Sequence, residues 1–442
     1  MVDTMLLAEI RAEIEKIPLI DTHEHTARTD VPGGLNASLF DVIRGTYVVE
    51  DFLASGMPHA DWQKAGQDPA KGWTLLKDRI NSLRNTAYYR ALICALRDLY
   101  DPTLEEIGER NWAPLSERIT AAYKRPDWFK HVLRERCHVE AALWDKVDAQ
   151  PDWPTIDRDL FIPVWRLDNF LFSYRALVRE ALTQKYGVQT VTFRDCRDMV
   201  ELALESARAN GVAAIKSNVA YQRSLRFDHS NAAHAGRIFM LSENDISPQD
   251  AKLYEDYMMS LIVEGAGRRD MPVQIHTGML SGPGYLAESN PMLLTGLIKR
   301  NPKTSFVLLH GGYPFTSECG ILAKSFENVY LDANWLPLIS PTAMKRALHE
   351  WLDSIPVSKI MIWGGDSYRI EGTYASLLLV KQVVSEVLAE KIHAGHLSES
   401  YVRTILWDIF RNNPARLYKT DALRNWRPND TRRTASPATT SL

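Results

Sequence analysis

The chain has 442 residues, enough for two or three domains or for one large α/β barrel that carries insertions. Its 45% hydrophobic and 24% charged residues are ordinary globular values and exclude a fibre or a chain that is disordered throughout. The 52 basic residues are outweighed by 55 acidic ones, and the net charge of −3 argues against a protein that binds nucleic acid by neutralising phosphates.

Further features concern the cellular compartment. No apolar run approaches the ~20 residues that span a bilayer. The N-terminal segment MVDTMLLAEIRAEIEKI carries acids where a signal peptide needs a basic start and an apolar stretch. The four cysteines are scattered and form no CxxC pair. We therefore expect a cytoplasmic protein with no disulfide framework and no membrane partner.

Eight short apolar runs follow one another along the chain, and they occupy residues 17–25, 138–145, 161–166, 212–218, 272–278, 305–312, 329–334 and 359–367. Segments with helical periodicity separate most of them, at 194–210, 248–266, 314–326, 341–353 and 371–390. Near-continuous apolar runs are typical of parallel strands buried on both faces, so the alternation predicts an α/β fold, a (β/α)8 TIM barrel. We expect no regular crossover over 146–160, which holds two prolines.

A barrel core needs ~250 residues, and most of the remaining residues fall between the first and second predicted strands. We expect residues 1–27 to form an N-terminal helix and the first strand, 28–130 a helical insertion, 131–428 the rest of the barrel and 429–442 a disordered tail. An insertion after the first strand emerges over the active face of a barrel, so we interpret 28–130 as a lid or cap. An oligomer contact or a subdomain without a role in the site is the alternative interpretation.

Residues with metal-binding side chains stand at the ends of these runs. His23 and His25 lie two apart on the first strand, so their imidazoles share one face. Lys216, His276, His310 and Asp366 end the fourth, fifth, sixth and eighth runs. Each of them alone has an ordinary structural explanation, such as a packing histidine, a paired amine or a turn aspartate. Together, all six at the carboxyl ends of five strands indicate a metal site at the catalytic face.

The order and local sequences of these residues resemble the amidohydrolase superfamily of metal-dependent barrels. The segments that carry the resemblance are IDTHEH, IKSNVAY, IHTGMLSG, NVYLD and IMIWGGDS, and they look like the branch that includes the nodulin-like domain fused to some glutamine synthetases. The long helical insertion is more loosely similar to uronate isomerases.

The resemblance implies a ligand set. His23, His25 and Asp366 would hold a first metal ion, and in two-metal members His276 and His310 hold a second, with a carbamylated Lys216 as bridge. In one-metal members His276 joins the first site and His310 contacts a ligand or the substrate. All six positions are retained, which favours a capacity for two ions. Imidazole and carboxylate ligands suit Zn²⁺, our first expectation, and also Mn²⁺.

The chemistry expected of such a site is hydrolysis of a C–N (amide or lactam) or ester bond. A divalent ion lowers the pKa of bound water from ~15.7 to near ~7. We expect Asp366 to act as general base and then acid, with His310 and Lys216 as further catalytic residues. A metal-dependent decarboxylase or hydratase, a uronate isomerase, and a binding barrel without turnover are the alternatives.

The substrate is expected to be a small molecule that bears a carboxylate, and the protein is expected to be a homo-oligomer. Residues near the strand ends supply the candidates for binding it, namely Arg166, Tyr221, Arg223, Trp335 and Arg369. A guanidinium is a natural clamp for a carboxylate. The alternative is that these arginines pair with acids of the rim such as Asp228 and Glu371.

Overall fold

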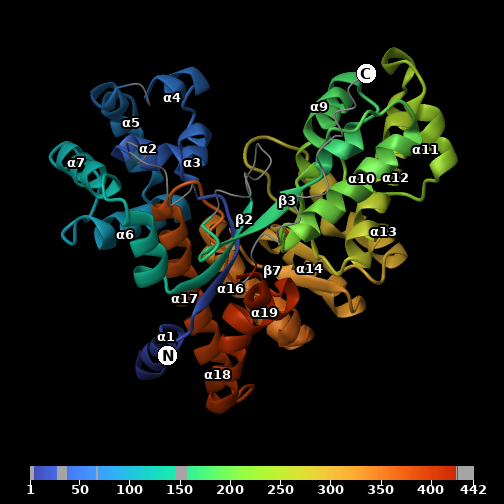
Figure 1. The fold of residues 1–442 in the computed structure, drawn as a ribbon. Coiled ribbons are helices and arrows are strands. Elements are labelled where there is room, and N and C mark those ends of the chain that lie inside the picture. Colours follow the sequence, from blue (N-terminus) through green and yellow to red (C-terminus); the bar gives the residue numbers. More distant parts are fainter. Residues whose placement is uncertain (1–3, 27–36, 66–67, 146–156, 425, 427–442) are drawn as a thin grey trace.

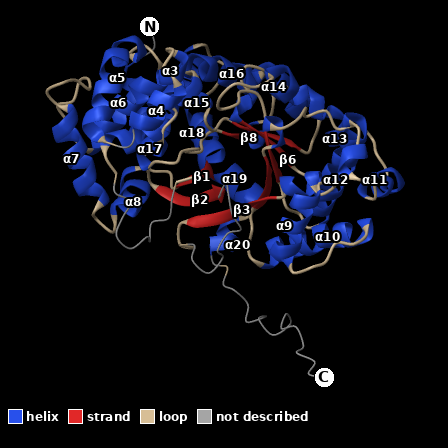
Figure 2. Ribbon diagram, turned by 90° about the horizontal axis from the view of Figure 1, so that it is seen from above, coloured by secondary structure: helices blue, strands red, loops and turns tan. Residues whose placement is uncertain are grey.

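The computed structural model describes residues 4–26, 37–65, 68–145, 157–424 and 426. At its centre, eight parallel strands pair in chain order from β1 to β8, and helices surround them (Figure 1, Figure 2). The strands are β1 (Leu19–Glu24), β2 (Val139–Asp145), β3 (Phe161–Arg166), β4 (Ala214–Ser217), β5 (Val273–His276), β6 (Phe306–Leu309), β7 (Val329–Asp332) and β8 (Ile360–Met361). Each strand lies within one of the eight predicted runs, and the predicted TIM barrel is confirmed.

The two ends of the sheet meet through the segment that follows β8. The amide of Thr22 donates to the carbonyl of Trp363 at 3.3 Å, and the amide of Asp366 donates to the carbonyl of His23 at 2.8 Å. Strand β1, which carries His23, is therefore joined by its backbone to the loop that carries Asp366.

The helices outside the barrel follow the predicted periodicity. The predicted helices correspond to α10 (Phe193–Ala209), α12 (Pro248–Arg268), α14 (Thr316–Ser325), α16 (Pro341–Ser354) and α17 (Ile370–His393). Local sequence fixes where they begin: Ser247 and Asp250 form a capping box before α12, whose first residue is a proline. The remaining helices of this part are α1 (Thr4–Ile14), α9 (Ala176–Tyr186), α11 (Ala232–Phe239), α13 (Thr295–Arg300), α15 (Leu336–Ile339), α18 (Glu399–Trp407), α19 (Asn413–Tyr418) and α20 (Thr420–Arg424).

The described part of the segment between β1 and β2 is mostly helical. It contains α2 (Leu39–Arg44), α3 (Val48–Ala54), α4 (His59–Ala65), α5 (Pro69–Leu83), α6 (Ala87–Leu99), α7 (Trp112–Tyr123) and α8 (Trp128–Lys130), and a π-helical turn (His131–Arg136) leads into β2. These helices form a separate group beside the barrel, and α6 packs along α17 (Figure 1).

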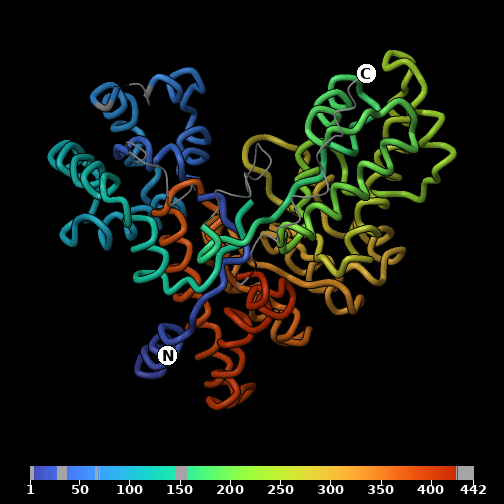
Figure 3. The backbone as a smooth tube through the Cα atoms, in the orientation of Figure 1, coloured from blue at the N-terminus to red at the C-terminus, as the bar shows by residue number. Residues whose placement is uncertain are grey.

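The amino ends of the strands are sealed by apolar packing. Ala141, Leu143, Ile162 and Met361 form a buried cluster with Tyr418 of α19. Helix α1 lies against α17 and α18, near the N-terminus in Figure 3. Because this end is closed, the opposite end of the barrel is the one that can admit a ligand.

Some predictions fall outside the described residues. The expected disordered tail at 429–442, and residues 146–156 of the stretch where no crossover was expected, belong to this group. Along the described residues, no helix combines the length and the apolarity that crossing a bilayer requires.

Candidate metal centre

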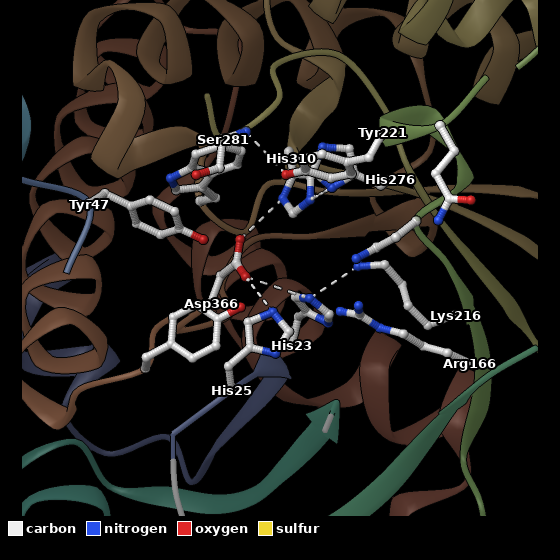
Figure 4. Close-up of a pocket in the computed structure, with 14 residues that line it drawn as sticks. His23, His25, Tyr47, Arg166, Lys216, Tyr221, His276, Ser281, His310 and Asp366 are labelled. Atoms are coloured by element: carbon white, nitrogen blue, oxygen red, sulfur yellow. Dashed lines mark hydrogen bonds and ion pairs between the residues drawn. The ribbon is translucent and has the colours of Figure 1, made fainter. Parts of the chain in front are cut away.

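A cavity of about 320 Å³ opens at the carboxyl ends of the strands (Figure 4). All six predicted ligands border it. The complete lining is His23, His25, Tyr47, Arg166, Lys216, Asn218, Tyr221, Gln222, His276, Ser281, His310, Trp335, Asp366 and Tyr368.

The carboxylate of Asp366 lies among three imidazoles. Its Oδ1 atom is 3.2 Å from Nε2 of His25 and 3.6 Å from Nε2 of His23. Its Oδ2 atom is 3.4 Å from Nδ1 of His310. Burial opposes ionisation, but the hydrogen bond from His25 and the attraction of the surrounding imidazoles together hold the pKa of Asp366 well below its ordinary range. Asp366 is therefore an anion in the folded protein.

Buried acids of β1 hold this arrangement in place. The carboxylate of Glu24 accepts hydrogen bonds from the amides of His25, Thr26 and Ser367, at 2.7, 2.8 and 3.2 Å. A side chain at Gly365 would collide with it, since an added Cβ would lie 2.1 Å from the Glu24 Oε2 atom. Glu24 therefore fixes the loop that carries Asp366 against the strand that carries the two histidines.

The neighbouring carboxylate of Asp21 has a similar role. It accepts from the amides of His23 and Gly365, both at 3.1 Å. Asp21 thus connects the strand that carries the two histidines to the loop that carries Asp366.

The backbone is strained at three residues that line the cavity. His310, Trp335 and Asp366 have φ angles of 64°, 60° and 44°. Residues other than glycine rarely adopt this left-handed region, and such conformations concentrate at functional sites.

Hydrogen bonds also set the protonation of the imidazoles. Nδ1 of His25 lies 2.7 Å from the carbonyl oxygen of Asp145, so it carries the proton and Nε2 faces Asp366. Nε2 of His276 lies 2.8 Å from the carbonyl of Met279, so its Nδ1 is the acceptor for Nε2–H of His310, also at 2.8 Å. Nδ1 of His310 is then unprotonated and faces the cavity.

Burial keeps three imidazoles of the site neutral. It holds the pKa values of His23 and His276 well below their ordinary value and lowers the pKa of His310 to about 4. Burial would lower the pKa of His25, but the hydrogen bond to Asp366 and the negative charges of Asp145 and Asp366 together raise it.

Lys216 is buried on the far side of His23 from Asp366 (Figure 4). Its Nζ atom is 3.1 Å from Nε2 of His23 and 4.0 Å from Oδ2 of Asp145. Burial lowers the pKa of Lys216 to about 8, against the opposing charge of Asp145.

The donor set fits a divalent cation. Among the described residues, Nδ1 of His310 and Oδ2 of Asp366 are buried without a hydrogen-bond partner. Nε2 of His23, Nε2 of His25 and Oδ1 of Asp366 converge, and imidazole nitrogen with carboxylate oxygen is the ligand set of Zn²⁺ and related ions. His23, His25 and Asp366 are the residues that could hold such an ion.

The predicted substrate-binding residues separate into two groups. Arg166, Tyr221 and Trp335 line the cavity. Arg223 does not, and it pairs with Glu255 at 2.9 Å and Asp256 at 2.7 Å.

Arg369 is not part of the cavity lining either. Its side chain packs against Gly45 and the ring of Tyr123 in the insertion. The structure thus brings three of the five predicted substrate-binding residues to the cavity and leaves Arg223 and Arg369 in other contacts.

Sequence reasoning missed other residues of the site. Asp145 ends the predicted run 138–145, so the argument from strand ends that selected the six ligands would also have found it. Tyr368 follows Asp366 by two residues and stacks on His25, with ring centroids 5.0 Å apart. Tyr47 comes from the insertion and Ser281 from the loop after β5, and nothing in their local sequence signals an approach to the cavity.

Comparison with known proteins gives matches of several kinds. A family profile described as Amidohydrolase matches residues 172–420. Protein fluG of Emericella nidulans is 32% identical over 150 residues, which are 34% of this chain and 17% of that protein. A uronate isomerase of Xanthomonas oryzae pv. oryzae is 26% identical over 158 residues, 33% of either protein. The chain therefore matches a third or less of the length of these relatives.

Solved structures agree with the fold over nearly the whole chain. A uronate isomerase of Thermotoga maritima has a TM-score of 0.78 at 16% identity, covering 94% of this chain and 98% of that one. A glucuronate isomerase of Caulobacter crescentus has a TM-score of 0.79 at 16% identity, covering 94% of both chains. The profile match extends over more than half of the 442 residues, and the chain therefore belongs to the amidohydrolase family.

Proposed function

We propose that the protein is a hydrolase that cleaves a C–N or ester bond of a small, carboxylate-bearing substrate. The observation that carries this proposal is the placement of the Asp366 carboxylate. Oδ1 faces His23 and His25, while Oδ2 faces His310 and has no hydrogen-bond partner among the described residues. One oxygen is thus available to a metal ion and the other to a proton.

The proposed cofactor is a single divalent ion, Zn²⁺ in the first instance, held by His23, His25 and Asp366. Such an ion activates water and polarises a carbonyl group. A second ion is disfavoured, because His276 and His310 are hydrogen-bonded to each other at 2.8 Å and the other ring nitrogen of His276 is bound to Met279. Mn²⁺ remains the alternative ion.

The side chains of the protein supply proton transfer and orientation. Asp366 is ionised and accepts the proton of the attacking water through Oδ2, then returns it to the leaving group. The neutral Nδ1 of His310, 3.4 Å from this oxygen, accepts a hydrogen bond from the protonated carboxyl and holds it in position. Both groups are buried, so bulk water does not compete for the proton.

The proposed substrate follows from the size and charge of the cavity. About 320 Å³ suits a small molecule. The cationic side chains Arg166 and Lys216 lie together on the side towards β3 and β4 (Figure 4). We therefore assign the carboxylate of the substrate to that side and the scissile carbonyl to the side of Asp366.

A second candidate function is aldose–ketose isomerisation of a uronate. Hydroxyl and amide groups border the cavity, on Tyr47, Asn218, Tyr221, Gln222, Ser281 and Tyr368, and they suit a polyhydroxylated acid. The fold likeness to uronate isomerases over 94% of the chain is consistent with this candidate.

A substrate panel tests the proposal. Purified metal-loaded protein is incubated with N-acyl amino acids, lactones, esters and uronates, and products are followed by mass spectrometry. Hydrolysis adds the elements of water, whereas isomerisation leaves the mass unchanged. We expect turnover in the first three classes; turnover of uronates alone would replace the proposal by the second candidate, and no turnover in any class would contradict both.

A further inference from the structure

We propose that Asp145, at the end of β2, is a further ligand of the metal ion, beside His23, His25 and Asp366. This inference deepens the proposed function and rests on the metal dependence assigned there. Asp145 is absent from the ligand set that the sequence predicts, and it lies on a strand that contributes no other residue to the site.

The first observation is convergence. One nitrogen each from His23 and His25 and one carboxylate oxygen from Asp145 all lie within 4.8 Å of one another. The Oδ2 atom of Asp145 is 3.9 Å from Nε2 of His23, the same nitrogen that is 3.6 Å from Asp366. A single cation beside this nitrogen could therefore contact both carboxylates.

The second observation is that a cation already lies between two of these groups. The ammonium nitrogen of Lys216 is 3.1 Å from Nε2 of His23 and 4.0 Å from Oδ2 of Asp145. Both side chains of that pair, His23 and Asp145, are buried almost completely. The region between the imidazole and the carboxylate is thus suited to positive charge.

The third observation is that hydrogen bonds orient the Asp145 carboxylate, as they orient carboxylates that bind metals. Arg166 donates to it from Nε at 2.8 Å and from Nη2 at 2.7 Å. A carboxylate has about four lone-pair positions, so these bonds leave acceptor capacity on both oxygens. Carboxylates that bind metals are themselves hydrogen-bonded by surrounding groups, which orient them. Burial opposes ionisation of Asp145, but Arg166 keeps its pKa below the ordinary value.

The same residue also orients a second ligand. The carbonyl oxygen of Asp145 accepts the Nδ1 proton of His25 at 2.7 Å, which directs Nε2 of His25 to Asp366. Two imidazoles and two carboxylates would then surround the ion. This oxygen-richer set accommodates Mn²⁺ as well as Zn²⁺.

The test measures metal binding by the full-length chain. Protein freed of metal by a chelator is titrated with Zn²⁺ in competition with a chromophoric chelator. Loss of a group that only orients ligands weakens metal binding by about 10–100-fold. We expect Asp145→Asn to exceed this range, with a loss of more than about 100-fold, and a smaller loss would overturn the assignment.

Asp168→Asn is the matched control. Asp168 follows the neighbouring strand β3 by two residues, and its oxygens accept from Ser217 Oγ and the amide of Asn218, both at 2.6 Å. The substitution Asp168→Asn removes one negative charge near the site, as Asp145→Asn does, but it removes no proposed ligand. We expect Asp168→Asn to weaken Zn²⁺ binding by no more than about tenfold, the lower limit of the range for orienting groups. A loss equal to that of Asp145→Asn would show that charge, and not ligation, is responsible.

A second variant keeps the assignment testable if Asp145→Asn fails to fold. Asp145→Cys places a thiolate at the same position, and thiolate ligands bind Zn²⁺ and Co²⁺. Loaded with Co²⁺, it should show a sulfur-to-cobalt charge-transfer band that the parent, with its own four cysteines, lacks. A folded Asp145→Cys protein that binds Co²⁺ without this band would overturn the proposal.

These measurements do not depend on turnover. A chain that loses metal on substitution of Asp145 but converts no compound of the substrate panel would contradict the proposed reaction and support the ligand assignment. The opposite pair of results would support the reaction and contradict the ligand assignment.

Discussion

In the proposed function, Asp366 takes part in both metal binding and proton transfer. Asp366→Asn retains the shape of the side chain but removes the base, and positioned proton transfer contributes about 10²–10⁴-fold to a rate. We expect a loss of that size in kcat/KM for the substrate that the panel identifies. Circular dichroism of the variant serves as the control for folding, and retention of more than a tenth of the activity would contradict the assigned role.

A second acid of the barrel interior gives a prediction on pH. Burial raises the pKa of Asp332 from 3.8 to about 7, against hydrogen bonds from Thr22 and Asn334. Between these values the folded protein keeps a proton that the unfolded chain has released. The free energy of unfolding therefore falls as pH rises through this window and levels off above it.

The substitution Asp332→Asn removes the carboxyl group that titrates in this pH window. In metal-free protein, we expect the free energy of unfolding of the variant to fall less than that of the parent between about pH 5 and about pH 8. Urea denaturation at several pH values measures the difference. Parallel curves for parent and variant would contradict the raised pKa of Asp332.

At the residue scale, chemistry at strand ends is what the sequence predicts best. His23, His25 and Asp366 could be selected because period two and the polarity of a parallel barrel leave few places for them. The bidentate hydrogen bond from Arg166 to Asp145 could not be predicted, since a sequence does not show which carboxylate a guanidinium contacts.

At the scale of elements, three segments distant in sequence meet over the cavity. The hydroxyl of Ser281, in the loop after β5, donates to Glu50 of α3 at 2.6 Å, and its amide donates to the hydroxyl of Tyr221 at 3.1 Å. The helical insertion is thereby tied to the opposite side of the cavity entrance. This contact supports the interpretation of 28–130 as a cap.

Ser281→Ala removes the hydroxyl that makes this connection. We expect faster amide hydrogen exchange in the loop 279–289, because local opening of the loop no longer requires this hydrogen bond to break. Ser317→Ala is the matched control, since its hydroxyl donates to Glu350 at 2.8 Å, away from the cavity. Equal exchange of 279–289 in the parent and both variants would show that the bond does not restrain the loop.

The insertion is also anchored through a buried carboxylate of the barrel. Glu371, at the start of α17, accepts a hydrogen bond from Tyr123 at 2.9 Å and another from Tyr100. Removing one donor from a buried acceptor costs about 1–3 kcal/mol. We expect Tyr123→Phe to lower the free energy of unfolding by that amount.

Denaturant titration compares this variant with Tyr401→Phe, whose residue is 45% exposed. We expect the Tyr401 variant to remain close to the parent in stability. An equally small effect of Tyr123→Phe would mean that Glu371 does not anchor the insertion.

At this scale, the limits of the sequence are physical. Strands and outer helices could be predicted because burial imposes a period on apolar residues. The helical nature of the insertion could be predicted in the same way. Its contacts with the cavity, through Tyr47 and Glu50, depend on tertiary packing that no local pattern encodes.

At the scale of the whole molecule, one end of the barrel is closed and the other holds the chemistry. Apolar side chains and Tyr418 seal the amino ends of the strands. Buried acids of β1 join the first strand to the loop after β8, and these two segments carry the proposed metal ligands. The fold thus explains how residues more than 340 positions apart in the sequence form a single centre.

The central claim is that this centre holds one divalent ion. Metal analysis of freshly purified protein, by plasma mass spectrometry, tests it most directly. We expect one ion per chain in the parent, and near zero after chelation and in His25→Asn. Two ions per chain would contradict the account of the paired histidines His276 and His310, and absence of metal from a folded parent protein that also fails to take up added Zn²⁺ or Mn²⁺ would contradict the metal centre itself.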